Sequence, residues 1–240
     1  MTKPLVAITG ASSGIGAGVA RVFSKAGYPL LLTARRVDLL RDLDLPRTMC
    51  RQHDVADAEG YAAIVDEAEA EFGPVDLLVN NAGYMALNEV RFQSPEDWRR
   101  QFEVNCVGLL NTTHAVLPRM VERRGGTIIN LGSTAGRNVY ENHTVYCATK
   151  HAVHAITEGL RREVAALGVR VLLISPGMVE SELLSSTESE EIKADYRAYR
   201  DQIGGALAPA DIGEAMRFAY EQRQQLAIWE LVVAPTGQLV

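Results

Sequence analysis

Short apolar segments alternate with longer amphipathic segments along the whole chain, and this alternation limits the possible folds more than any other feature. The apolar runs are nearly continuous, as strands covered on both faces should be. They lie at residues 4–9, 28–33, 75–80, 126–131, 169–175 and 226–233, with a weaker run at 47–54. Helical patterns fall between them, at residues 14–26, 57–72, 96–123, 145–167 and 209–223. The alternation predicts an α/β fold of the Rossmann type, a doubly wound parallel sheet of about seven strands with helices on both faces.

The chain has the length of one domain and offers no place to divide it. Its 240 residues contain no linker, internal repeat or low-complexity tract, so we expect a single domain over residues 1–240. The long irregular section is 176–208, which is rich in Ser, Glu and Tyr. A section of that length inside a compact domain predicts a functional loop or a substrate lid.

The composition argues against several classes of function. A formal net charge of −6 and the lack of a basic stripe argue against nucleic-acid binding. No apolar run reaches the ~18 residues of a membrane span, and "MTKPLVAITG" enters a core strand too early for a signal peptide. We therefore expect a cytoplasmic protein with no membrane partner. The cysteines Cys50, Cys106 and Cys147 form no C-x-x-C pair, and His151 and His154 lack a matching ligand cluster, so we expect free thiols and no metal site.

A glycine-rich loop, "TGASSGIG" (9–16), follows the first predicted strand and opens the first predicted helix. Gly10 can turn the chain tightly, and Gly14 and Gly16 let the backbone approach a pyrophosphate. The helix N-terminus then offers free N–H groups and a partial positive charge to that anion. The spacing is G-x-x-x-G-x-G and not the general G-x-G-x-x-G, so a strand–helix turn without a ligand is the alternative.

A polar residue, a glycine or a proline lies just past the end of most of the predicted strands. In an open parallel sheet, ligands bind beyond the carboxyl ends of the strands. These residues are far apart in the sequence, but we expect them to lie together in one crevice at that edge of the sheet. They are Gly10, Arg35, Asp54, Asn81, Ser133 and Pro176.

Five motifs together carry a family resemblance over the whole chain. Besides the glycine loop they are "NNAG" (80–83), Asn105 in "FEVNCVG", Ser133 with the Tyr146-x-x-x-Lys150 pair, and "SPGMVES" (175–181). In this order and spacing the chain resembles the short-chain dehydrogenase/reductase family. The resemblance implies an oxidoreductase that transfers a hydride between a nicotinamide cofactor and a carbonyl or alcohol.

The end of the second strand predicts which cofactor is used. The stretch is "LTARR", with Arg35 at the position where NAD-preferring relatives carry Asp. A guanidinium suits the 2′-phosphate of NADP(H), and Arg36 and Ser12 could assist. The alternative is that both arginines simply open the next helix on a solvated face. By resemblance, the cofactor-binding set is Gly10, Ser12, Ser13, Gly14, Ile15, Gly16, Arg35, Arg36, Asp54, Val55, Asn81, Ala82, Gly83, Asn105, Tyr146, Lys150, Pro176, Gly177, Val179 and Ser181.

The resemblance also assigns catalytic roles to Asn105, Ser133, Tyr146 and Lys150. Tyr146 would donate or accept the proton, Ser133 would polarise the substrate oxygen, and Asn105 would hold a water of the proton relay. A free tyrosine has a pKa of about 10, and the ammonium of Lys150, one helical turn away, is expected to lower it. Lys150 would also bind the nicotinamide ribose. Cys147, next in the chain, is interpreted as a packing thiol, with a redox switch as the alternative.

The substrate and the assembly are predicted from closer resemblances within the family. The stretches "AGRNVYENHTVYCATK" and "LAIWELVVAPTGQ" look like NADP-dependent clavulanate dehydrogenases and related 3-hydroxy-acid and serine dehydrogenases. They imply a small polar aldehyde, ketone or β-hydroxy acid. A buried carboxylate of the substrate needs a cationic partner, for which Arg137 is the first candidate and Arg197 and Arg200 are the others. The alternative is that these arginines are solvated. Family members commonly associate through the two long helices, so a homotetramer or homodimer is expected. The alternatives in function are a catalytically silent NADP(H)-binding regulator and an epimerase or dehydratase on the same fold.

Overall fold

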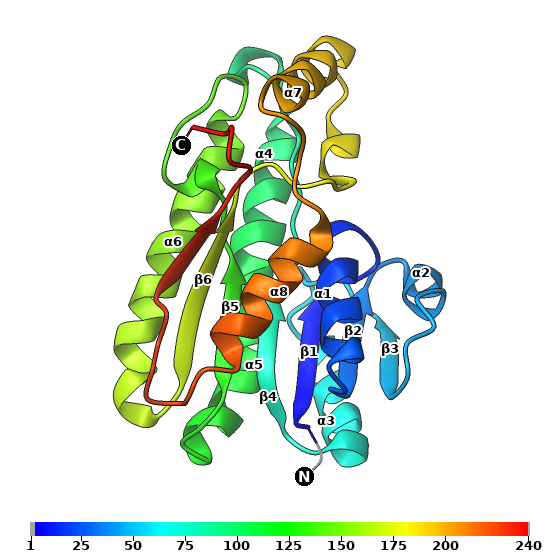
Figure 1. Ribbon diagram of the computed structural model, residues 1–240, viewed down its shortest axis with the longest axis vertical. Coiled ribbons are helices and arrows are strands. Elements are labelled where there is room, and N and C mark those ends of the chain that lie inside the picture. The colour runs from blue at the N-terminus through cyan, green and yellow to red at the C-terminus, as the bar shows by residue number, and fades with distance from the viewer. Residues whose placement is uncertain (1–2, 240) are drawn as a thin grey trace.

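The structure is a computed structural model that describes residues 3–239, and its centre is one parallel sheet. The sheet has seven strands in the order β3-β2-β1-β4-β5-β6-β7, and every neighbouring pair is parallel (Figure 1). The strands are β1 (Leu5–Thr9), β2 (Leu30–Ala34), β3 (Thr48–Gln52), β4 (Val75–Asn80), β5 (Thr127–Leu131), β6 (Arg170–Pro176) and β7 (Glu230–Val233). The predicted doubly wound fold is confirmed.

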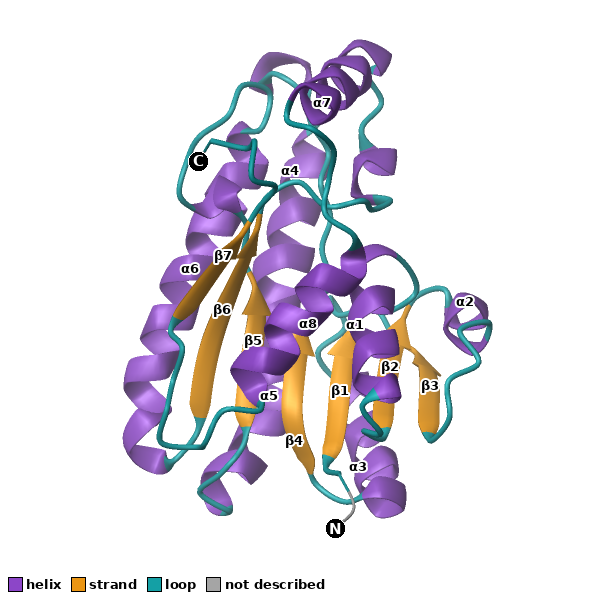
Figure 2. Ribbon diagram, viewed as in Figure 1, coloured by secondary structure: helices purple, strands orange, loops and turns teal. Residues whose placement is uncertain are grey.

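Helices cover both faces of the sheet, as Figure 2 shows. They are α1 (Gly14–Lys25), α2 (Val37–Arg41), α3 (Gly60–Phe72), α4 (Pro95–Phe102), α5 (Gly108–Glu122), α6 (Thr144–Val164), α7 (Glu190–Gln202) and α8 (Pro209–Tyr220). Helices α1 and α8 pack together on one face, whereas α3, α5 and α6 cover the other. The sheet is therefore the middle of three layers.

Alternate residues of each strand enter different cores because successive side chains of a strand point to opposite faces. In β1, Val6 and Ile8 join the core beneath α1 and α8, while Leu5 and Ala7 join the core beneath α3, α5 and α6. All five residues of β1 are buried. This double coverage explains why the strands read as continuous apolar runs in the sequence.

The structure divides the predicted helix at 96–123 into three parts. Between α4 and α5 lies a π-helical turn, Glu103–Val107, which contains Asn105. Helix α4 begins with a hydroxyl cap, since the hydroxyl of Ser94 accepts a hydrogen bond from the Asp97 N–H and Pro95 occupies the first turn. π-helical turns are rare and occur mostly at functional sites.

Two other expectations need correction. The section 176–208 is not irregular throughout, because it contains α7, whose helix pattern is obscured by its many charged residues. The last strand begins at Glu230 and not at residue 226, since residues 226–229 have no strand structure, although the Trp229 carbonyl accepts a hydrogen bond from the Leu173 N–H of β6. Within residues 3–239, no helix is both long and apolar enough to cross a membrane.

Candidate active site

A cavity of about 790 Å³ lies at the carboxyl ends of the strands. It collects most of the residues predicted from the sequence, although they are scattered from residue 10 to residue 181. Two of the predicted residues, Gly16 and Asn105, do not line the cavity. The predicted residues that line it are Gly10, Ser12, Ser13, Gly14, Ile15, Arg35, Arg36, Asp54, Val55, Asn81, Ala82, Gly83, Ser133, Tyr146, Lys150, Pro176, Gly177, Val179 and Ser181.

The glycine loop has the backbone that only glycine adopts freely. Gly10 has a φ of +64° and Gly14 a φ of +51°, both in the left-handed region. A Cβ on Gly16 would lie 2.5 Å from both the Gly10 carbonyl oxygen and the Asn81 Nδ2. Asn81 Nδ2 in turn donates to the carbonyls of Thr9 at 2.9 Å and Gly10 at 3.1 Å. Gly16 thus lets Asn81 hold the loop, and the loop presents the N-terminus of α1 to the cavity, which suits an anionic ligand.

The two arginines after β2 have different surroundings. Arg36 donates to the Ser13 hydroxyl at 3.1 Å and forms an ion pair with Glu182 at 2.7 Å. Hydrogen bonds from Arg36 and Ser13 hold the pKa of the Glu182 carboxyl below its usual value. Arg35 also lines the cavity, but its side chain has no hydrogen bond or ion pair with any residue of the described chain. Of these two arginines, Arg35 is thus the one whose guanidinium has no carboxylate partner among the described residues.

Asn105 links the segment after β4 to the helix that carries the tyrosine. Its Oδ1 accepts from the Tyr84 N–H at 2.8 Å, and its Nδ2 donates to the Tyr84 carbonyl at 2.9 Å and the Thr149 hydroxyl at 3.0 Å. The Thr149 hydroxyl donates to the Tyr146 carbonyl at 2.8 Å. An amide oxygen has a second lone pair, so contact between Asn105 and a relay water stays a prediction.

Ser133, Tyr146 and Lys150 meet in the middle of the cavity wall. Burial raises the pKa of Tyr146 well above its ordinary value, and a hydrogen bond with Ser133 opposes that rise. Burial lowers the pKa of Lys150 to about 8. Its Nζ donates to the Leu131 carbonyl at 2.9 Å and lies 5.8 Å from the centroid of the Tyr146 ring. Burial is the largest cause of the raised pKa of Tyr146, and the expected lowering of that pKa by the Lys150 ammonium stays a prediction.

Residues 4–192 match the short chain dehydrogenase family. The chain belongs to this family. An uncharacterized oxidoreductase of Staphylococcus saprophyticus is 36% identical, over 98% of this chain and 96% of its own. Among solved structures, the closed form of a serine dehydrogenase complexed with NADP⁺ has a TM-score of 0.91 and 33% identity, covering 98% of this chain and 96% of its own. A variant of actinorhodin polyketide ketoreductase, solved with NADPH, has a TM-score of 0.86 and 29% identity, over 97% of this chain and 96% of its own.

The three arginines predicted to bind a substrate carboxylate do not line the cavity of this dehydrogenase. Arg137 makes a bidentate ion pair with Glu230, at 3.1 and 2.9 Å. Arg197 lies 3.7 Å from Glu190, and Arg200 pairs with Asp201 at 2.8 Å. These arginines satisfy carboxylates of the protein itself, so that prediction is wrong.

The substrate end of the cavity is mainly aromatic and apolar. We define it by the lining residues Met85, Ala135, Tyr140, His143, Met178, Ile192 and Tyr196, and the polar residues Glu141, Asn142 and Asp195 line the cavity beside them. The His143 ring stacks on Tyr196, with 6.4 Å between centroids, and meets Tyr140 and Tyr146 edge-on. Burial lowers the pKa of His143, so this imidazole is neutral near pH 7. Helix α7 supplies Ile192 and Tyr196 and lies beyond the carboxyl ends of the strands (Figure 1).

One lining residue has no signal in the sequence. Gln238, near the end of the chain, lines the cavity, and its Oε1 accepts a hydrogen bond from the Met178 N–H at 2.8 Å. It thereby fastens the segment after β7 to the segment after β6. A lone glutamine among loop residues carries no pattern, so only the fold reveals this contact.

Proposed function

We propose that this short-chain dehydrogenase transfers a hydride between NADP(H) and a small, polar, uncharged aldehyde or ketone, or the corresponding alcohol. The proposal rests on one observation: Ser133, Tyr146 and Lys150 line the same cavity as Gly10 and Gly14. We call these two glycines, which lie at the N-terminus of α1, the glycine cradle. The NADP⁺ and NADPH complexes of the related enzymes support the choice of cofactor.

The chain's own residues fit both anionic groups of NADP(H), which are the pyrophosphate and the 2′-phosphate. The N-terminus of α1, with Gly10 and Gly14 in front of it, offers backbone donors to a pyrophosphate. Arg35, without a carboxylate partner among the described residues, offers a guanidinium to a 2′-phosphate. When bound, NADPH supplies the hydride.

The catalytic residues supply the proton and stabilise charge. In reduction, the Ser133 hydroxyl hydrogen-bonds the substrate oxygen and Tyr146 donates its phenolic proton to that oxygen. The raised pKa keeps Tyr146 protonated near pH 7, the state that a general acid requires. The phenolate left behind is close enough to Lys150 for the ammonium to stabilise it.

The charge of the substrate is inferred from the substrate end of the cavity. A buried carboxylate needs a cationic partner. Among the described residues, the parts of the cavity lining that come from 133–146 and 176–199 contain no lysine or arginine and include the carboxylates of Glu141 and Asp195, and the pKa of His143 is lowered by burial. We therefore favour an uncharged carbonyl compound over the β-hydroxy acid that the sequence also suggested. In this proposal the section 176–208, with α7, serves as the lid over the substrate.

The proposal is tested with carbonyl compounds of equal length and different charge, by following NADPH absorbance. We expect the highest kcat/KM for uncharged aldehydes or ketones, and lower values for analogues with a terminal carboxylate. A carboxylated substrate that is turned over fastest would contradict the substrate class. If NADPH binds but no carbonyl or alcohol reacts, the chain is the catalytically silent regulator instead.

A further inference from the structure

Four polar side chains form a connected cluster behind the catalytic wall, outside the cavity lining. The Ser175 hydroxyl on β6 donates to Glu230 Oε1 on β7 at 2.8 Å, and it lies 3.3 Å from His154 Nε2 on α6. Glu230 also receives both hydrogen bonds from Arg137. Because the Ser175 hydroxyl gives its proton to Glu230, it accepts from His154 Nε2–H. We call these four residues, Arg137, His154, Ser175 and Glu230, the polar brace.

The polar brace lies against residues 132–136, the short loop that carries Ser133. A Cβ on Gly136 would lie 2.4 Å from His154 Nε2, and one on Gly132 would lie 2.9 Å from the same atom. The His154 ring therefore packs directly against the glycines before and after Ser133. Burial lowers the pKa of His154. Arg137 directly follows the loop, so its ion pair fixes the other end.

We propose that the polar brace positions the Ser133 hydroxyl for catalysis. The proposal rests on the proposed function, because it assumes that Ser133 acts on the substrate oxygen. Within the loop, the Ser133 hydroxyl oxygen accepts a hydrogen bond from the Ala135 N–H at 3.1 Å. The direction of that hydroxyl depends on where the whole loop lies, and the loop is held against β6, β7 and α6 by the polar brace.

The chemistry of the polar brace explains why its removal would act at Ser133. Ser175 is fully buried, and the Glu230 side chain is 24% exposed. Loss of the Glu230 carboxylate would leave the buried Ser175 hydroxyl and the Arg137 guanidinium without this acceptor. The half-exposed Arg137 guanidinium would then turn toward water, and the end of the loop would lose its ion pair to β7. Arg137, His154, Ser175 and Glu230 are positioning residues, since none of them lines the cavity.

The test compares Glu230→Ala with Glu214→Ala, each alone and combined with Ser133→Ala. Glu214 is a matched control because it also accepts two hydrogen bonds from one arginine, Arg217, but on α8 and away from the loop. We expect Glu230→Ala to lower kcat roughly tenfold, with little change in the NADPH Kd. In the Ser133→Ala background the same change should have almost no effect, because the residue it positions is gone. Glu230→Gln, which keeps an acceptor oxygen, should restore part of kcat.

The outcomes separate this inference from the proposed function. A kcat for Glu230→Ala equal to that of Glu214→Ala would overturn the inference. So would an equal loss of kcat with and without Ser133, since the effect would then not pass through Ser133. If Ser133→Ala itself has the kcat of the wild type, the proposed role of Ser133 fails instead. Should Glu230→Ala not fold, Glu230→Gln in both backgrounds gives the same comparison.

Discussion

At the scale of single residues, Arg35 should decide the choice between NADPH and NADH. It lines the cavity without a carboxylate partner in the described chain, whereas Arg36 is paired with Glu182. One charge-assisted contact contributes roughly 1.5–3 kcal/mol, so Arg35→Asp should raise the KM for NADPH at least about tenfold and leave that for NADH unchanged or lower. Arg41→Asp, on the exposed surface of α2, makes the same change in net charge and serves as the control. An unchanged ratio of the two KM values would contradict the assignment.

Lys150 should set the alkaline limit of carbonyl reduction. Its pKa is lowered to about 8, whereas that of Tyr146 is raised, so the ammonium is the first of the two charges to change as pH increases. Above that pH Lys150 is neutral and no longer stabilises the phenolate, so kcat should fall with a midpoint near 8. A kcat profile measured from about pH 6 to about pH 10 checks this. A flat or rising profile would show that the charge of Lys150 is not needed.

At the scale of elements, two glycines in helices should respond to alanine in opposite directions. A Cβ on Gly108, at the start of α5, would lie 2.5 Å from Val55 Cγ2, so Gly108→Ala should destabilise the fold by about 1–3 kcal/mol. A Cβ on Gly159 in α6 would meet nothing within 4 Å, so Gly159→Ala should stabilise by about 0.5–1 kcal/mol. Urea unfolding measures both, and a stabilising Gly108→Ala would disprove the packing of α5 on Val55.

The sequence predicted most elements because their apolar spacing is local, and it failed where tertiary contacts decide. The π-helical turn at Glu103–Val107 depends on Asn105 reaching Tyr84 and Thr149, contacts that periodicity does not encode. A parallel sheet brings the carboxyl ends of its strands to one edge, so most residues of the site could be predicted from the sequence. The ion-pair partner of Arg137 could not be predicted, because Glu230 lies 93 residues away and becomes a neighbour only when β7 joins the sheet.

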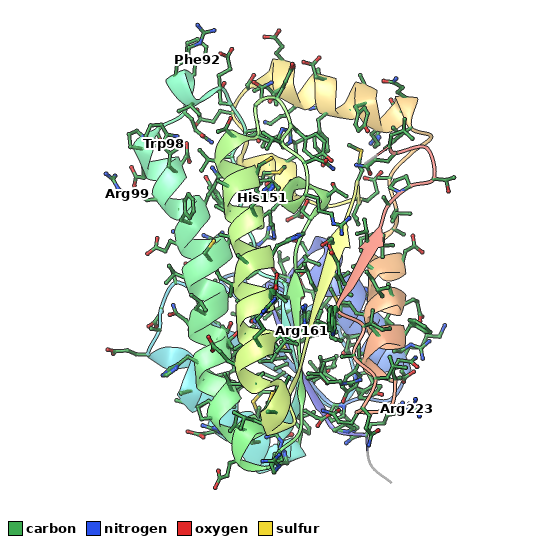
Figure 3. All side chains as sticks on the ribbon, turned by 90° about the vertical axis from the view of Figure 1, so that its left-hand side faces the viewer. Phe92, Trp98, Arg99, His151, Arg161 and Arg223 are labelled. Carbon is green, nitrogen blue, oxygen red and sulfur yellow. The ribbon has the colours of Figure 1, made fainter. Side chains whose placement is uncertain are left out.

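At the scale of the whole molecule, the side formed by α4, α5 and α6 is the proposed surface for a second copy of the chain (Figure 3). Val153 and Leu160 recur at helical spacing along α6, but both are buried in the core and do not serve this purpose. Exposed apolar side chains lie instead along α4, the π-helical turn and α5, where Phe102, Val107 and Leu110 are 42–48% exposed. Exposed large apolar side chains favour association where they form one patch.

Light scattering tests this proposed assembly. We expect a dimer or tetramer at micromolar concentration, and a shift toward monomer for Leu110→Glu because burying a carboxylate in the interface is costly. Leu39→Glu, on α2, introduces the same charge at a similarly exposed leucine away from this side. A wild-type monomer would refute the proposal, and equal masses for the two variants would place the interface elsewhere.

The most direct test of the central claim is the turnover of Tyr146→Phe with NADPH and the best carbonyl substrate. The substitution removes one hydroxyl from a buried ring and leaves the glycine cradle and Arg35 untouched. Because general acid catalysis typically contributes ~10²–10⁴-fold, kcat should fall by that factor while the NADPH Kd, measured by fluorescence titration, stays within about twofold. A kcat close to that of the wild type, with NADPH still bound, would show that Tyr146 is not the proton donor and would contradict the account.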